Sequence, residues 1–107
     1  MGAWETREAS FEKFQEIDAQ LRFKSLARRN KLLGLWAGKK LGMTEPAAED
    51  YARRLVETLI DKDDDEALAQ SLEVQFAKLV PPISGHRIRR KIDETTAIAA
   101  KEIFEGR

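Results

Sequence analysis

The chain contains no cysteine, one histidine and three prolines, and it has no long apolar run. Without cysteine it can form neither a disulfide nor a thiolate metal site, which fits a reducing compartment. No apolar run approaches the roughly 20 residues that a membrane-spanning helix needs. The N-terminal residues also lack the apolar stretch of a secretory signal. These features predict a cytoplasmic protein, or one held at a membrane only through a partner.

Charge is abundant in this chain but unevenly distributed. Charged residues make up 36% of the 107 residues and hydrophobic residues 42%, a mix that suits one folded domain with a modest core. The net charge is zero, yet residues 21–41 carry seven bases and no acid, whereas residues 42–80 carry ten acids and four bases. Such blocks can neutralise one another within the fold or steer the protein towards a partner. The sequence is compatible with both.

Apolar spacing predicts an all-α fold, since alternating runs typical of strands are lacking. Helices are expected over residues 19–41, 44–60, 65–80 and 84–105. Gly42 stands at the place of a left-handed C-terminal cap, Thr44 and Ser84 at N-cap positions, and the acidic run 61–66 supplies a third cap. A proline pair beginning at Pro81 stops the third segment. Short linkers favour antiparallel neighbours, so the predicted architecture is a compact four-helix bundle.

One apolar stripe per predicted helix defines the candidate core. The stripes are Leu26, Leu33, Ala37 and Leu41, widened by Phe23, Leu32 and Trp36; Ala48, Tyr51, Ala52, Leu55 and Leu59; Leu68, Leu72, Phe76 and Leu79; and Ile88, Ile92, Thr95 or Thr96, Ala99 and Ile103. Gly34 costs a helix interior about 1 kcal/mol relative to alanine. It therefore indicates close approach by another helix or by a partner backbone.

The first eighteen residues differ from the rest of the chain. Trp4, Phe11, Phe14, Ile17 and Leu21 would fall within an arc of about 140° on a helix, so the segment is amphipathic. It is acidic, lacks a strong cap, and would be marginal as an isolated helix. We expect a mobile arm over residues 1–18 that becomes helical in a partner's groove, with residues 19–107 forming the bundle. The alternative is that the segment extends the first helix and folds onto the bundle.

Candidate catalytic and metal sites are weak. Asp61, Asp63 and Asp65 have the spacing of calcium ligands, but Glu66 and Leu72 replace the glycine and the glutamate that a calcium loop requires. The single histidine lies at the start of the last predicted helix and has no nucleophile or metal-binding partner nearby in sequence. We therefore expect no catalytic activity, no metal and no cofactor.

Two basic clusters, at residues 28–31 and 87–91, could contact phosphates. Neither is interleaved with aromatic residues for base stacking, and the chain has no net charge, so nucleic acid is not the expected partner. A small nucleic-acid- or ribosome-associated helical module that uses these clusters is nevertheless the alternative function. A small nucleotide-sensing domain is a weaker third.

One segment carries a specific resemblance. The sequence ARRNKLLGLWA at residues 27–37, with LRFK at 21–24 and KLG at 40–42, resembles the zeta subunit of alphaproteobacterial F-type ATP synthases, an ATPase inhibitor family. The resemblance extends to REASFEKF at residues 7–14 and to IRR and DE at residues 88–90 and 93–94. Gly38 departs from the alanine expected there. The second and third helices match in pattern only.

The resemblance implies a four-helix bundle with an inhibitory N-terminal arm. In that family the arm inserts at a catalytic interface between alpha and beta subunits, near the gamma stalk, and blocks ATP hydrolysis. The chain would then be cytoplasmic and meet the inner membrane only through the synthase. The amphipathic arc suggests Phe11, Phe14 and Ile17 as apolar anchors and Glu12, Lys13 and Glu16 as polar contacts. The family motif itself supplies Arg28, Arg29, Asn30, Lys31, Gly34 and Trp36.

Overall fold

The computed structural model describes the backbone of residues 2–61 and 64–106 and the side chains of residues 19–58 and 64–106. Within these ranges lie four α-helices: α1 (Gly2–Lys40), α2 (Glu45–Asp61), α3 (Asp65–Phe76) and α4 (Gly85–Glu105). No strand occurs within the described residues. The predicted all-α class with four helices is confirmed.

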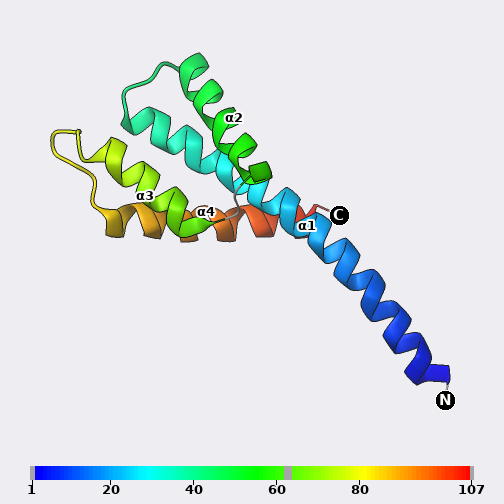
Figure 1. Ribbon diagram of the computed structural model, residues 1–107. Helices are drawn as coiled ribbons and strands as arrows, with labels where there is room; N and C mark the ends of the chain where they lie inside the picture. The colour runs from blue at the N-terminus through cyan, green and yellow to red at the C-terminus, as the bar shows by residue number, and fades with distance from the viewer. Residues whose placement is uncertain (1, 62–63, 107) are drawn as a thin grey trace.

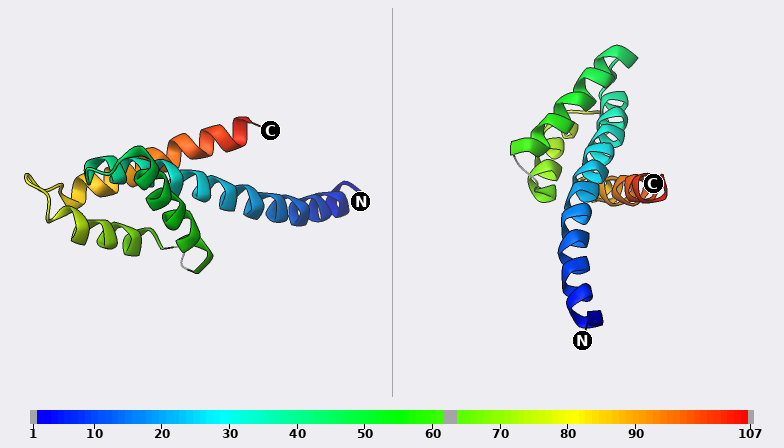
Figure 2. Two further views of the ribbon diagram at one scale, coloured as in Figure 1. Left: turned by 90° about the horizontal axis from the view of Figure 1, so that it is seen from above. Right: turned by 90° about the vertical axis from the view of Figure 1, so that its right-hand side faces the viewer.

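The helix α1 is the central element of the bundle. Both α2 and α4 pack against it, and α3 packs against α4 (Figure 1). α1 and α4 run antiparallel, so the C-terminal end of α1 lies at the same end of the molecule as the start of α4. Figure 2 shows this arrangement from two further directions, with the N-terminal half of α1 extending beyond the other helices.

The predicted start of the first helix was wrong. We expected Ala19, whereas α1 begins at Gly2 and continues without a break to Lys40. Neither glycine nor proline occurs between residues 3 and 33, so nothing in the backbone chemistry interrupts the helix. The backbone of the arm residues therefore continues the first helix, as the alternative supposed, but it extends away from the bundle and does not fold onto it (Figure 1). The side chains of Phe11, Glu12, Lys13, Phe14, Glu16 and Ile17 lie outside the described residues.

The turn between α1 and α2 depends on one glycine. Gly42 has a φ of +81°, the left-handed conformation that favours glycine, and the N–H of Met43 donates to the carbonyl of Gly38 at 2.9 Å. At the start of α2, the carbonyl of Thr44 accepts from the N–H of Ala48 at 2.8 Å, which places Thr44 at the N-cap position. Both predicted boundary residues are confirmed.

The caps of α3 and α4 also match their prediction. The Asp64 side chain accepts from the N–H groups of Glu66 and Ala67, at 3.0 and 3.2 Å, and the Ser84 hydroxyl accepts from the N–H of Arg87 at 3.2 Å.

The third helix ends earlier than predicted. α3 stops at Phe76 rather than near residue 80, because the chain tightens into bonds between residues three apart. One of these bonds joins the N–H of Leu79 to the carbonyl of Phe76 at 3.2 Å.

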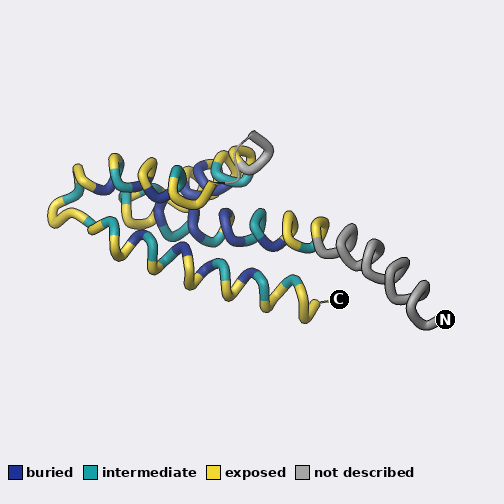
Figure 3. The backbone as a smooth tube through the Cα atoms, turned by 60° about the horizontal axis from the view of Figure 1, so that its bottom comes forward, coloured by how far each residue is buried: buried dark blue, intermediate teal, exposed yellow. Residues whose placement is uncertain are grey.

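Two of the four predicted stripes, those of α2 and α4, have most of their members buried, and the stripes of α1 and α3 contribute two buried members each (Figure 3). The buried members are Leu33, Ala37, Ala48, Tyr51, Ala52, Leu72, Phe76, Ile88, Ile92, Thr95 and Ala99. Phe23 is an exception, with 49% of its surface exposed, and the side chain of Leu59 lies outside the described residues. Over the described part of the chain, no helix is both long and apolar enough to cross a bilayer.

Candidate functional site

Arg29, from the family-like motif, is buried at the centre of the bundle with only 1% of its surface exposed. Its guanidinium donates to three side chains: from Nε to Asn30 Oδ1 at 2.6 Å, from Nη1 to Thr96 Oγ1 at 3.1 Å, and from Nη2 to Asp65 Oδ1 at 2.9 Å. A planar guanidinium can serve several acceptors at once, which makes arginine suitable for such a position. Arg29 therefore ties α1 to both α3 and α4.

Asn30 completes this connection towards α2. Its side chain is also buried, and Nδ2 donates to the backbone carbonyl of Leu55 at 2.8 Å. Arg29 and Asn30 together link α1 to all three other helices. Because both side chains are buried, neither is available to contact the phosphates of a nucleic acid. Their burial weakens the alternative function as a nucleic-acid-associated module.

Gly34 allows α1 and α2 to approach closely. A Cβ atom placed on Gly34 would lie 2.5 Å from the Cα of Ala52 and 2.9 Å from its Cβ, closer than real side chains come. Gly38 lies one turn further along α1, where a Cβ would lie 2.8 Å from the Cβ of Ala48. The predicted close approach at Gly34 is confirmed, and the neighbour is a helix of the same chain.

The ring of Trp36 connects α1 with α3 and α4. Its ring meets that of Phe76 edge-on, with centroids 5.4 Å apart and planes inclined by 64°. The Nζ atom of Lys91 lies 5.5 Å from the centre of the same ring, within the range of a cation–π interaction. Trp36 thus contacts both α3 and α4.

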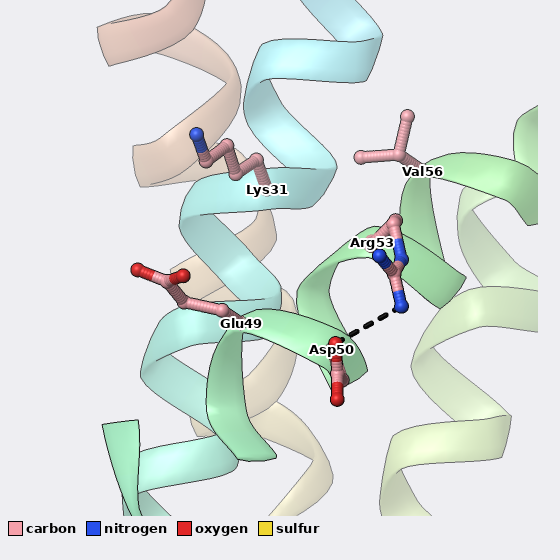
Figure 4. A pocket seen from close by; sticks show the side chains of 5 residues that line it. All are labelled: Lys31, Glu49, Asp50, Arg53 and Val56. Atoms are coloured by element: carbon pink, nitrogen blue, oxygen red, sulfur yellow. Dashed lines mark hydrogen bonds and ion pairs between the residues drawn. The ribbon is translucent and has the colours of Figure 1, made fainter. Parts of the chain in front are cut away.

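Lys31 faces away from this core. It lines a shallow surface pocket of about 340 Å³ between α1 and α2, together with Glu49, Asp50, Arg53 and Val56 (Figure 4). Within the pocket Arg53 pairs with Asp50 at 2.9 Å. The lining mixes both signs of charge, so this pocket does not select a ligand of one charge.

Exposed ion pairs cross between helices. Arg28 on α1 donates to Glu102 on α4 at 2.7 Å. Arg89 on α4 pairs with Glu66 at 2.5 Å and also with Glu73, both on α3. Exposed pairs of this kind contribute little to the free energy of unfolding.

The Arg89 pairs shift the titration of the groups involved. The hydrogen bond from Arg89, followed by its charge, lowers the pKa of Glu66 from its ordinary 4.5, although some desolvation opposes this. The carboxylates of Glu66 and Glu73 raise the pKa of Arg89. In the core, burial raises the pKa of Tyr51, whose hydroxyl donates to Gln75 at 3.0 Å and links α2 to α3.

The sequence predicted which residues form the motif but not their partners. Arg29 is 67 positions from Thr96 and 36 from Asp65, and no local pattern connects such residues. In the sequence, Asp65 belongs to an acidic, helix-capping run and has calcium-ligand spacing with Asp61 and Asp63. The adjacent Asp64 is the cap, and Asp65 instead binds the buried guanidinium.

Comparison with known families agrees with the resemblance carried by residues 27–37. A family model described as ATPase inhibitor subunit zeta matches residues 1–102, from the start of the chain into α4. No curated protein and no solved structure matches the chain. Because the family match spans nearly the entire sequence, this chain belongs to the ATPase inhibitor subunit zeta family.

Proposed function

We propose that this chain is a regulatory inhibitor subunit of an F-type ATP synthase and has no catalytic activity of its own. It would block ATP hydrolysis by inserting residues 1–18 at a catalytic interface between an alpha and a beta subunit, near the central gamma stalk. The match to a family of ATPase inhibitor subunits carries this proposal. The chain would be cytoplasmic and peripheral to the inner membrane when bound to the synthase.

The packing of α1 supports separate roles for the arm and the bundle. Within the described side chains of α1, Ser25 is the first buried residue, and the buried positions continue to Gly38. Residues 19–24, in contrast, are exposed or only partly buried. The bundle therefore holds α1 through its C-terminal half, which is consistent with an arm over residues 1–18 and a docking domain over residues 19–107.

The Arg29 and Asn30 hydrogen bonds give the docking domain a defined shape. By linking α1 to α2, α3 and α4, they fix the direction in which α1 leaves the bundle. A fixed exit direction lowers the entropy lost when the arm enters a groove. The family motif thus serves inhibition indirectly, by positioning the helix that continues into the arm.

Within the arm, Phe11, Phe14 and Ile17 recur every three residues and so lie on adjoining positions of one helical face. We assign them as apolar anchors and Glu12, Lys13 and Glu16 as polar contacts to the synthase. Aromatic anchors in a protein groove commonly contribute most of the binding free energy.

Deletion of residues 1–18 tests the proposed function. The purified full chain should inhibit ATP hydrolysis by the membrane-bound synthase of its own organism in a titration. The truncated chain should lose this inhibition while keeping a melting temperature close to that of the full chain. Full inhibition by the truncated chain would disprove the arm mechanism. Unfolding on truncation would show instead that the segment is part of the folded core.

A further inference from the structure

Two long segments of this chain contain bases but no acid. Residues 19–44 carry seven bases, and residues 74–92 carry five. Because α1 and α4 are antiparallel, the C-terminal end of the first segment and most of the second meet at one end of the bundle. This is the end with the α1–α2 and α3–α4 loops, opposite the N-terminus (Figures 1 and 2).

The fold uses only some of these cations. Arg28, Arg29 and Arg89 pair with acids of other helices, and Lys91 pairs with Glu94 in its own helix. At the loop end, five further cations are exposed, and within the described side chains none of them forms an ion pair. We call these five the loop-end cationic surface: Lys39, Lys40, Lys78, Arg87 and Arg90.

Part of this surface opposes the stability of the fold. The first turn of α4 contains His86 and Arg87 and no acidic residue. The N-terminal end of a helix carries a partial positive charge, so an acid is favourable there and a cation is not. Proteins tend to break local stability rules of this kind at functional or strained sites.

Exposed apolar residues lie at the same end of the bundle as these cations. Val80, in the α3–α4 connection, has 98% of its surface exposed, and both Pro81 and Pro82 are exposed beside it. Exposed apolar side chains next to unpaired cations form the mixed surface that protein interfaces use, with charges at the rim.

We propose that the loop-end cationic surface docks on an acidic patch of a protein subunit of the synthase. The inference rests on the proposed function, since a chain whose arm occupies a groove between subunits brings its bundle against protein. Charge complementarity argues for an acidic partner and predicts faster association at low salt. The surface lies at the end of the bundle away from the arm, so the two would make separate contacts on one target and strengthen each other.

A charge-neutralised full chain tests this dock. The dock variant carries Lys39→Gln, Arg87→Gln and Arg90→Gln. The matched control carries Lys24→Gln, Arg54→Gln and Lys101→Gln, which removes the same charge from exposed positions elsewhere. Binding of each labelled chain to the purified catalytic sector is measured at about 50 and about 200 mM salt. Thermal melts establish that both variants are folded.

The dock variant should bind at least about tenfold more weakly than the wild type at low salt and depend less on salt, whereas the control should stay within about twofold. Wild-type binding by the dock variant would overturn the proposal. An equal loss in both variants would do the same, since only total charge would then matter. Tighter wild-type binding to vesicles of anionic phospholipid than to the catalytic sector would show that the surface recognises lipid.

The same samples distinguish failure of the dock from failure of the proposed function. Inhibition of ATP hydrolysis by the wild type, together with unchanged binding of the dock variant, would refute the dock alone. Salt-dependent binding of the wild type without inhibition would refute the inhibitory function and leave the dock standing.

Discussion

Arg29 and Asp65 form an ion pair in which only one partner is buried: the guanidinium is 1% exposed, whereas 56% of the carboxylate side chain is exposed. Burying both charges would cost several kcal/mol of desolvation, which attraction often fails to recover. Here Asp65 keeps much of its hydration, while Thr96 and Asn30 supply the other acceptors for Arg29. Within the described residues, no buried side-chain nitrogen or oxygen lacks a hydrogen-bond partner.

Removal of Arg29 should therefore be much more costly than neutralisation of Asp65. Arg29→Ala is expected to lower the free energy of unfolding by about 2–5 kcal/mol, because it leaves a cavity and breaks three hydrogen bonds. Asp65→Asn keeps an acceptor oxygen at a hydrated position and should cost less than about 1 kcal/mol. Urea denaturation of both variants measures the difference. Losses of similar size would show that the charge of Asp65 matters more than its exposure suggests.

Alanine substitution should destabilise the fold more at Gly34 than at Gly38. Gly34→Ala forces a Cβ to within 2.5 Å of the Cα of Ala52, and overpacking of this kind costs about 1–3 kcal/mol. That cost outweighs the gain of about 1 kcal/mol in helix propensity. Gly38→Ala meets the smaller obstacle of the Ala48 methyl group at 2.8 Å and should be tolerated better. Thermal melts check the order, and a more damaging Gly38→Ala would contradict it.

Glu66 should contribute stability that depends on pH. Its pKa is lowered in the folded state by Arg89, so its contribution is present above the ordinary value of 4.5 and is lost as the pH falls through the lowered pKa. Glu66→Gln should reduce the urea midpoint at about pH 7, and this difference should shrink as the pH is lowered from about 7 to below 4.5. A difference between wild type and variant that stays constant over this range would exclude the Arg89 pair as its source.

Phe14 should matter for inhibition and Phe23 should not, if the arm ends near residue 18. Phe14→Ala is expected to weaken inhibition of ATP hydrolysis by about 1–3 kcal/mol, the usual cost of losing an aromatic anchor. Phe23 is half exposed on α1 beyond the arm, and Phe23→Ala serves as the matched control. The concentration giving half inhibition is the measurement. An equal effect of Phe23→Ala would move the end of the arm towards the bundle.

Local chemistry was sufficient to predict most of the helical framework. Gly42, Asp64 and Ser84 act on backbone groups within four residues of themselves, so their capping roles can be recognised without knowing the fold. The apolar stripes were equally readable, because a helix of known period places residues such as Leu33 and Ala37 on one face. The start of α1 was predicted wrongly because the lack of a strong N-cap residue was given more weight than the lack of glycine and proline, the residues that interrupt a helix.

The role of the family motif could be decided only by the tertiary structure. In sequence, Arg28 and Arg29 are adjacent members of one basic cluster. In the fold, Arg28 forms an exposed pair with Glu102, whereas Arg29 is buried among side chains from two other helices. Consecutive helical residues point about 100° apart, so the position of the neighbouring helices determines which of them is buried. The sequence alone indicated the family and the positions of most of the helices. Helix packing determined which charged side chains hold the bundle together and which remain available for a partner.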